Sequence, residues 1–194
     1  MSIKSYIKGW IGEFGINLAG KIALSKKDYH GFHNVTLETD DGTTQIDHVF
    51  ISRFGIFVVE TKNLSGWIFG GEHDKQWTQK FPKASYKFQN PLRQNYAHIK
   101  ALESIMPTVP ADAFHSVIAM CGEHIIKTKK NMPRNVTRGM WFAGYIRGFK
   151  TEVLSNEQVN EAINALANKR LSATRKTNTK HVEYLTKKHN LSKD

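Results

Sequence analysis

Cysteine is almost absent from this sequence: among 194 residues, Cys121 is the only one. A single thiol forms no internal disulfide and cannot build a zinc site from protein thiolates alone. Long apolar runs are also absent, since no segment approaches the roughly 20 residues of a membrane-spanning helix. Lys4 and Lys8 interrupt the first ten residues, which therefore do not resemble a secretion signal. These absences predict a cytoplasmic protein that does not enter a membrane.

Acidic residues are scarce relative to basic ones. Lys and Arg total 28 against 17 Asp and Glu, which gives a net charge of +11 and a pI near 9.7. Residues 124–150 contain seven basic residues and no acid, and residues 169–194 contain eight basic residues and two acids. Such an excess concentrates polyanions around a protein. It favours nucleic acid as the partner, with anionic lipid and acidic proteins as alternatives.

Apolar spacing and turn signals divide the chain into helices and strands. Apolar residues recur every three or four positions over residues 3–22, which predicts an amphipathic helix. Asn90 and Pro91 are typical of the start of a helix, here running to about residue 106, and Ser155 is a typical cap for a helix through Ala167. Apolar runs bounded by Gly, Asp and Pro predict strands at 35–38, 44–52, 55–62, 66–69, 116–121 and 139–145.

This order of elements predicts an α/β protein with a central mixed β-sheet flanked by helices. We expect one domain over residues 1–168 and a basic tail, partly helical, over residues 169–194. The segment 26–34 is polar and is predicted to be a loop, while the segment 77–89 is aromatic and polar without a clear period and indicates neither helix nor strand.

The strands predicted at 44–52 and 55–62 are adjacent, since only Arg53 and Phe54 separate them. With a two-residue loop, Asp47 faces Glu60 and Gln45 faces Lys62 across an antiparallel hairpin. Because side chains alternate along a strand, these four groups share one face. A three-residue loop would instead turn Asp47 away from Glu60.

Two carboxylates facing each other on a hairpin, with Cβ atoms roughly 5 Å apart, repel one another, and burying an unpaired charge costs several kcal/mol. A hard divalent cation would resolve the repulsion, since Mg²⁺ is commonly held by one or two carboxylates, waters and a substrate phosphate. Lys62, on the same face as Glu60, is placed to orient a metal-bound water, steady a phosphate oxygen or act as general base. The alternative is a structural salt bridge between Lys62 and one of the acids.

The residues around this hairpin resemble those of the nuclease-related domain (NERD), a branch of the PD-(D/E)XK nuclease superfamily. The resemblance spans about residues 11–102 and is carried by Gly12-Glu13, Gln45-Ile46-Asp47-His48, Gly55-Ile56-Phe57-Val58-Val59-Glu60-Thr61-Lys62-Asn63-Leu64-Ser65-Gly66 and Asn90-Pro91-Leu92-Arg93-Gln94. It implies a restriction-endonuclease-like fold, a site for Mg²⁺ or Mn²⁺, and hydrolysis of phosphodiester bonds in DNA.

By the motif match, Asp47 and Glu60 correspond to metal ligands and Lys62 to the catalytic lysine. The resemblance also implies that Glu13 is a further metal ligand, against the alternative of a solvated glutamate. Gln94, one turn into the second helix, is expected to contact substrate or the carboxylates, against the alternative of a polar helix surface. His48 is predicted to pack on the opposite face of the sheet, and His98, one turn beyond Gln94, is set aside as a site residue.

Contacts to the nucleic acid are expected from residues beside the site and from two basic segments. The candidates are Gln45, Asn63, Lys127, Lys129, Lys130, Arg134, Arg138, Arg175 and Lys176. Lysine and arginine contacts to phosphates would supply affinity without sequence specificity. A few aromatic residues among Trp67, Trp77, Phe81, Tyr86 and Phe88 are candidates to stack on bases, while most are expected in the core.

Together these features predict a metal-dependent deoxyribonuclease that uses Mg²⁺ or Mn²⁺ and no organic cofactor; the oligomeric state is left open. One alternative is a nucleic-acid-binding module with a degenerate site. Another is a basic adaptor whose tail binds acidic protein or lipid surfaces.

Overall fold

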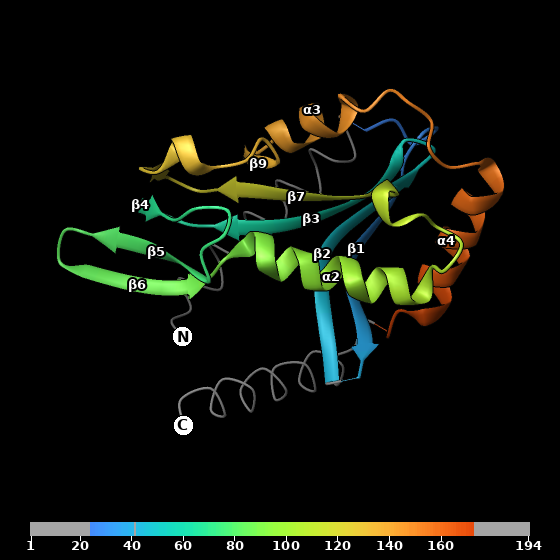
Figure 1. Ribbon diagram of the computed structural model, residues 1–194, viewed down its shortest axis with the longest axis horizontal. Helices are drawn as coiled ribbons and strands as arrows, with labels where there is room; N and C mark the ends of the chain where they lie inside the picture. The colour runs from blue at the N-terminus through green and yellow to red at the C-terminus, as the bar shows by residue number, and fades with distance from the viewer. Residues whose placement is uncertain (1–23, 41, 173–194) are drawn as a thin grey trace.

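The structure is a computed structural model, and it describes residues 24–40 and 42–172 (Figure 1). Four predictions lie outside the described residues: the helix over residues 3–22, Glu13, the tail residues Arg175 and Lys176, and the partly helical end of the tail. In the described part of the chain, no helix combines the length and the apolar composition needed to cross a bilayer.

A five-stranded mixed sheet forms the centre of the molecule, in the order β1-β2-β3-β7-β9. Strands β1, β2 and β3 are antiparallel neighbours, whereas β3, β7 and β9 run parallel. Their bounds are His30–Thr39, Gly42–Ser52, Gly55–Asn63, Phe114–Cys121 and Val136–Arg138. The predicted strands at 44–52, 55–62 and 116–121 are confirmed as the central members of this sheet.

A second sheet, in the order β6-β5-β4-β8, extends the first one. Its strands are Ala84–Gln89, Gln76–Phe81, Gly66–Phe69 and His124–Ile126. Asn63 pairs with Cys121 and Gly66 pairs with His124, so β4 and β8 continue β3 and β7 in the same parallel register. The β5–β6 hairpin is added to the outer edge of β4 and projects from one end of the molecule (Figure 1).

Helices cover both faces of the five-stranded sheet. Helix α2 (Pro91–Ile105) runs along one face and α4 (Asn156–Lys169) closes one end, and both contribute to a core that includes Leu102, Leu166 and Val58. Helix α3 (Trp141–Arg147) packs Phe142 and Ile146 against the other face, in a second core. Figure 1 shows α2 and α3 on opposite sides of β3 and β7. The predicted mixed sheet flanked by helices is therefore confirmed.

The helix caps read from the sequence are present. The Asn90 side chain accepts a hydrogen bond from the Leu92 N–H, and Pro91 occupies the first turn of α2. Ser155 and Gln158 form a reciprocal capping box at the start of α4. Both helices end within two residues of the predicted position.

Two predictions about local structure are wrong, and one segment without a prediction forms a hairpin. The strand predicted at 139–145 is instead the short helix α3, whose Phe142, Ala143 and Ile146 follow helical spacing and are buried. The segment 26–34 is not all loop, because β1 already begins at His30 and pairs with β2. The aperiodic segment 77–89 belongs to the β5–β6 hairpin, where buried Trp77 is surrounded by half-exposed and exposed residues, so the strand alternation is weak.

Candidate active site

The β2–β3 hairpin has the predicted two-residue connection, Arg53 and Phe54. Its ladder runs from Ser52–Gly55 to His48–Val59 and ends there, one step before the predicted Asp47–Glu60 pair. On the other side of β2, the β1 ladder omits Asn34–Asp47, and Asn34 has a φ of 50°, in the left-handed region. Asp47 therefore lies where the β2–β3 ladder ends and where one pair is missing from the β1–β2 ladder. We call the place where Asp47, Glu60, Lys62 and Gln94 lie the notch.

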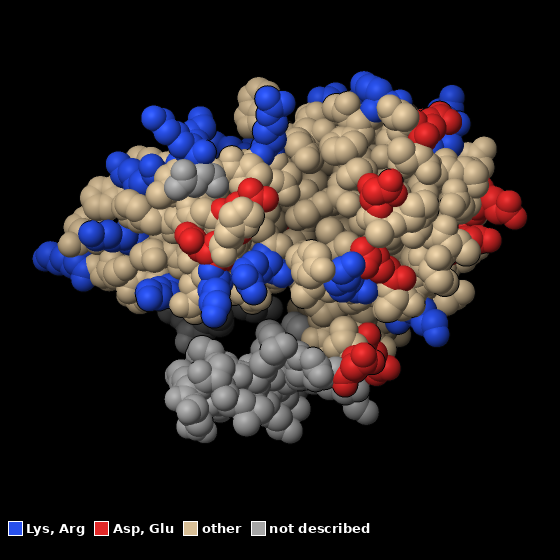
Figure 2. All heavy atoms as spheres, in the orientation of Figure 1, with Lys and Arg blue, Asp and Glu red and all other residues tan. Residues whose placement is uncertain are grey.

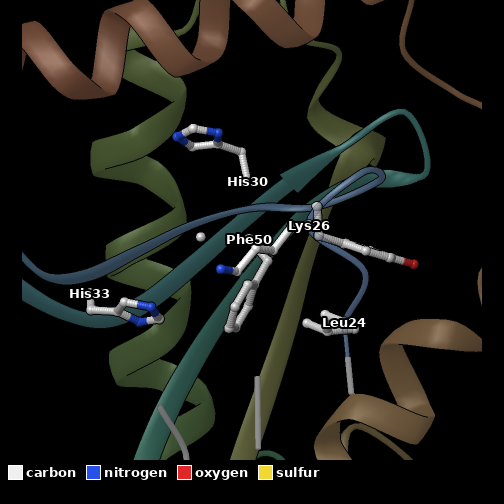
Figure 3. Close-up of a pocket in the computed structure, with 7 residues that line it drawn as sticks. Leu24, Lys26, His30, His33 and Phe50 are labelled. Carbon is white, nitrogen blue, oxygen red and sulfur yellow. The ribbon is translucent and has the colours of Figure 1, made fainter. Parts of the chain in front are cut away.

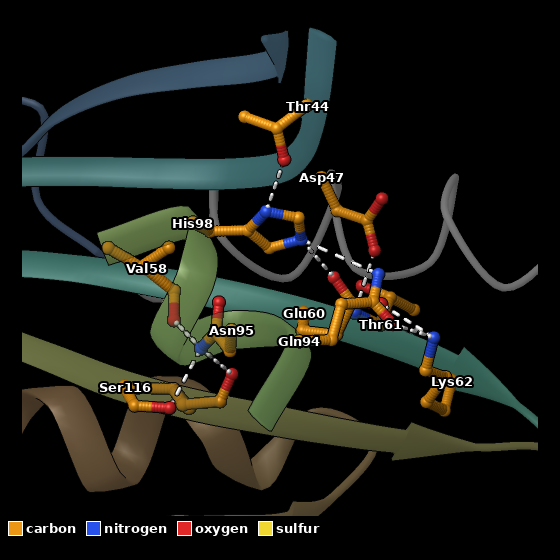
Figure 4. Close-up of polar contacts among 11 residues, drawn as sticks. Thr44, Asp47, Val58, Glu60, Thr61, Lys62, Gln94, Asn95, His98 and Ser116 are labelled. Carbon is orange, nitrogen blue, oxygen red and sulfur yellow. Dashed lines mark hydrogen bonds and ion pairs between the residues drawn. The ribbon is translucent and has the colours of Figure 1, made fainter. Parts of the chain in front are cut away.

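The Asp47 carboxylate accepts a backbone hydrogen bond at the point where the β2–β3 ladder ends. Its Oδ2 atom accepts a 2.7 Å hydrogen bond from the Thr61 N–H. A buried N–H without an acceptor is costly, so the side chain replaces the strand partner that the ladder no longer provides. This contact fixes the Asp47 carboxylate beside Glu60, the residue that precedes Thr61, as Figure 4 shows.

Glu60 is buried, with 2% of its surface exposed, and each carboxylate oxygen has a nitrogen partner. Oε1 lies 2.7 Å from Lys62 Nζ, and Oε2 lies 3.2 Å from His98 Nε2. Burial raises the pKa of Glu60, but the hydrogen bond from His98 and the charge of Lys62 outweigh burial and hold the pKa below its ordinary 4.5. Glu60 is thus a buried carboxylate that remains ionised because both of its oxygens are partnered.

Helix α2 completes the network. Lys62 Nζ donates to Gln94 Oε1 at 2.9 Å, so the predicted lysine and glutamine are in direct contact. Gln94 Nε2 lies 3.4 Å from His98 Nε2, and His98 Nδ1 lies 2.8 Å from Thr44 Oγ1 of β2. The sequence pattern does not identify His98 as a site residue, yet His98 joins α2 to β2 and β3. Its spacing of four residues from Gln94 places both side chains on one face of α2 but does not by itself predict the contact with Glu60.

A buried amide positions α2 over the sheet. Asn95 Nδ2 donates to the Val58 carbonyl at 2.8 Å and to Ser116 Oγ at 2.8 Å, so one side chain joins α2 to β3 and β7 (Figure 4). Asn90 Nδ2 also donates to three carbonyls in the loop before β5, those of Gly71, Glu72 and Asp74. These bonds determine where Gln94 and His98 meet β3.

The opposite face of the hairpin has a different chemistry. His48 packs there, as predicted, with 1% of its surface exposed and its Nδ1 atom 2.9 Å from His33 Nδ1. Burial lowers the pKa of His48 from 6.5 to about 3. A cavity of about 370 Å³ beside it is lined by Leu24, Tyr29, His33, Phe50 and neighbouring residues, and no acid is among the described lining residues (Figure 3). The carboxylates are therefore confined to the α2 face.

The predicted nucleic-acid contacts fall into two groups among the described residues. Gln45 is half-buried on β2, two residues before Asp47, and Asn63 ends β3. We call residues 127–138, from the end of β8 to the end of β9, the β8–β9 connection. Its basic residues are all exposed: Lys127, Lys129, Lys130, Arg134 and Arg138. Lys62 pairs with Met120 and Met120 with Arg138, so Arg138 lies at the same strand ends as Lys62. Figure 2 shows Lys and Arg concentrated at that end of the molecule.

The side chains at the notch fit a hard divalent cation by their donor type. Asp47 and Glu60 offer carboxylate oxygens, and Mg²⁺ is commonly held by one or two carboxylates with the remaining positions filled by waters and phosphate. In residues 24–40 and 42–172, no group of three or more His, Cys, Asp or Glu side chains is arranged to hold a metal. The described part of the chain thus contributes two carboxylates, with an ammonium group beside one of them.

The protein is thus an α/β domain in which two acids and a lysine, Asp47, Glu60 and Lys62, lie on adjacent strands of a mixed sheet. A family model, the nuclease-related domain (NERD), matches residues 8–121, and the chain belongs to this family. NERD is generally assigned to the PD-(D/E)XK superfamily.

Among curated proteins, the chain is similar to an uncharacterized protein of Bacillus anthracis, with 44% identity over 120 residues. The match covers 58% of this chain and 57% of that protein, so it spans little more than half the length of its relative. No solved structure matches the chain significantly.

Proposed function

We propose that this protein is a divalent-metal-dependent nuclease that hydrolyses phosphodiester bonds in DNA. The observation that carries the proposal is the notch itself, where Asp47, Glu60 and Lys62 from two strands meet Gln94 from α2. A buried, ionised carboxylate beside a lysine is common at sites of catalysis, where environments that shift pKa values are concentrated.

Asp47 and Glu60 are the residues that would hold Mg²⁺ or Mn²⁺. When bound, the cation would polarise a phosphoryl oxygen and lower the pKa of its bound water. A metal ion also compensates the repulsion between two neighbouring carboxylates. This assignment makes the half-buried Asp47 and the buried Glu60 the acidic side of the site.

Lys62 is the residue that would contact the reacting phosphate. Its ammonium group has three N–H donors. Glu60 and Gln94 accept from it, at 2.7 Å and 2.9 Å, and hold the group in one position. The third donor is then oriented for a phosphate oxygen or an attacking water, where a fixed positive charge stabilises the charge that builds up during hydrolysis. Gln94 acts by positioning Lys62.

Affinity for DNA would come from the exposed cations of the β8–β9 connection. Lys127, Lys129, Lys130, Arg134 and Arg138 lie in a segment without acids, at the strand ends nearest the notch. Contacts from such residues to phosphates are salt-dependent and independent of sequence. Gln45 and Asn63, at the two sides of the notch, are proposed to touch the strand that is cut.

A second candidate function is binding of nucleic acid without cleavage. It is favoured by one observation: both oxygens of Glu60 already have nitrogen partners, Lys62 and His98. In a degenerate site, this salt bridge would be structural and would substitute for a metal ion. The two candidates differ in whether divalent cations are required for any activity.

The test is cleavage of labelled linear, circular, single-stranded and branched DNA with Mg²⁺ or Mn²⁺ and with EDTA. We expect cleavage that EDTA abolishes, and its loss in Asp47→Ala and Lys62→Ala while circular dichroism and DNA binding are retained. Matched controls are Asp112→Ala and Lys100→Ala, an exposed acid and an exposed lysine outside the notch. Full cleavage by both notch variants would defeat the proposal, and absence of cleavage by the wild-type protein with intact DNA binding would favour the second candidate.

A further inference from the structure

The second sheet has one buried face and one exposed face. Ile68 and Trp77 are fully buried and join Met120 in a core cluster. The residues that alternate with them point the opposite way: in the ladders, Trp67 pairs with Lys80 on one side and with Ile125 on the other. We call this opposite surface the outer face, and it consists of Trp67, Thr78, Lys80, Lys87, Ile125 and Lys127.

The outer face combines exposed apolar surface with positive charge. Trp67 is 37% exposed and Ile125 is 56% exposed. Lys127 Nζ lies 5.4 Å from the centre of the Trp67 ring, and Lys80 is the neighbour of Trp67 on β5. The strands β4, β5, β6 and β8 contain no Asp or Glu. Among the described residues, none of the three lysines forms an ion pair.

We propose that the outer face binds single-stranded nucleic acid, with a base stacked on Trp67 and the backbone phosphates held by Lys80, Lys87 and Lys127. A sheet that presents an aromatic ring among cations suits a polyanion whose monomers carry flat apolar faces. In a duplex those faces are covered by neighbouring bases, so only an unpaired segment can stack on the indole. The inference rests on the proposed function in one respect, that nucleic acid is the ligand.

The outer face is continuous with the basic connection near the notch. Ile125 also lines a cavity of about 530 Å³ between β8 and β9, together with Lys129, Arg134 and Arg138. Arg138 belongs to the register row that reaches Lys62 through Met120. The outer face and the notch lie on opposite faces of the strands, since Ile68 clusters with Met120 and Met120 pairs with Lys62. A strand bound on the outer face would reach the notch around the β8–β9 edge, past Lys129, Arg134 and Arg138. The outer face would then select unpaired DNA for the proposed nuclease site.

The experiment measures binding without cleavage. Fluorescence anisotropy in EDTA follows a labelled oligothymidylate of about 12 nucleotides, a length within the range covered by one single-strand-binding module. The full chain is compared with Trp67→Ala, Trp67→Phe and the pair Lys80→Ala/Lys87→Ala. Matched controls are Tyr86→Ala, an exposed aromatic on the other face of the hairpin, and Lys26→Ala/Lys27→Ala, two exposed lysines before β1.

We expect Trp67→Ala to weaken binding by about fivefold or more, which is the lower limit for one stacked base. Trp67→Phe should keep most of the affinity because a phenyl ring also stacks. Lys80→Ala/Lys87→Ala should lower the slope of log K against log salt by about 1.4, since each phosphate contact to a single strand contributes about 0.7. The control variants should bind like the wild-type protein at equal salt, apart from a uniform charge effect in the lysine pair.

Wild-type affinity in Trp67→Ala, or equal losses in Trp67→Ala and Tyr86→Ala, would overturn the inference. If Trp67→Ala weakened the binding of a duplex of the same length by the same factor, the assignment to single strands would be overturned. A change of oligomeric state in Trp67→Ala, measured by light scattering, would make the outer face a contact between copies of the chain. If Trp67→Ala does not fold, the lysine pair alone decides, because both side chains are exposed.

The failures of the two proposals can be told apart. If binding depended on Trp67 but the protein cleaved no substrate, the proposal of binding at the outer face would stand and the nuclease proposal would be rejected. If Lys62→Ala abolished cleavage but substitutions of Trp67, Lys80 and Lys87 left DNA binding unchanged, the nuclease proposal would stand and the proposal of binding at the outer face would be rejected.

Discussion

His98 and His48 are both buried, on opposite faces of the β2–β3 hairpin, and their surroundings differ. His98, from α2, has its Nε2 atom 3.2 Å from the Glu60 carboxylate and its Nδ1 atom 2.8 Å from Thr44 Oγ1. His48, on β2, contacts the imidazole of His33, and its Nε2 atom has no hydrogen-bond partner among the described residues. On the α2 face, the Glu60 carboxylate has Lys62 and His98 as partners. On the other face, burial disfavours the charged form of His48.

The difference shows where this fold can support polar chemistry. A buried charge is tolerated only where hydrogen bonds and an opposite charge replace water. The α2 face meets that condition for Glu60 through Lys62 and His98. The His48 face does not, and burial there holds the imidazole neutral, with a pKa of about 3. Three predictions test this comparison, in order of decreasing expected effect.

The largest effect is expected from removing the charge of Glu60 without changing its shape. In Glu60→Gln, Lys62 loses its ionic partner and the proposed metal loses a ligand. We expect cleavage to fall by at least about 100-fold, the loss seen when one electrostatic partner of a transition state is deleted. Single-turnover cleavage of labelled DNA is the measurement.

The matched control for this variant is Glu103→Gln, because Glu103 is a glutamate of α2 whose partner is the exposed Lys100. It should cleave at the wild-type rate. Equal rates for Glu60→Gln and the wild-type protein would mean that the buried charge serves the fold alone, and the comparison between the two faces would then say nothing about catalysis.

A smaller effect is expected from Asn95→Ala, which acts on the position of α2. The variant leaves the Val58 carbonyl and Ser116 Oγ without their buried donor. We expect the free energy of unfolding, from urea denaturation, to fall by about 2 to 3 kcal/mol, in the range for buried polar groups left unsatisfied. Cleavage should fall as well, because Gln94 and His98 move with the helix.

Asn135→Ala is the comparison variant, since Asn135 Nδ2 donates to the Ser116 carbonyl from a half-exposed position where water can replace it. It should lose about 1 kcal/mol or less. Equal losses in the two variants would show that burial of Asn95 adds nothing to its contacts.

Features of the site set by neighbouring residues were predictable from the sequence. The register of the β2–β3 hairpin followed from two apolar runs with only Arg53 and Phe54 between them, and the start of α2 followed from Asn90 and Pro91. Both depend on interactions within a few residues. Gln94 was expected to contact substrate or the carboxylates, and its hydrogen bond with Lys62 was not predicted.

Features set by distant contacts were not predictable. His98 meets Glu60, 38 residues away, because Asn95 ties α2 to strands β3 and β7, and no local pattern encodes that placement. The end of the ladder at His48–Val59 depends in the same way on the Asp47–Thr61 hydrogen bond. The β5–β6 hairpin was missed because most of its residues are half-exposed or exposed, so burial did not impose a strong apolar alternation.

The smallest effect is expected from His48→Phe, which removes the neutral imidazole from the other face. The folded pKa of His48 is about 3 and its ordinary value is 6.5. Between these values the unfolded chain binds a proton that the folded chain does not. Stability of the wild-type protein therefore falls as pH decreases below about 6.5, by about 1.4 kcal/mol per pH unit for this group.

In His48→Phe this contribution disappears. Between about pH 6.5 and about pH 5, the free energy of unfolding should therefore fall by about 2 kcal/mol less in the variant than in the wild-type protein. Glu60 loses its stabilising ionisation only below its ordinary pKa of 4.5, outside this window. Near pH 7 the variant loses the contact of His48 Nδ1 with His33 Nδ1 but keeps a ring beside Phe50, whose ring stacks on His48, so its free energy of unfolding should be lower by only about 1 kcal/mol. Urea denaturation across this range is the measurement, with the exposed His30→Asn as control. Parallel pH profiles for His48→Phe and the wild-type protein would mean that the His48 face tolerates a proton, and the contrast between the two faces would disappear.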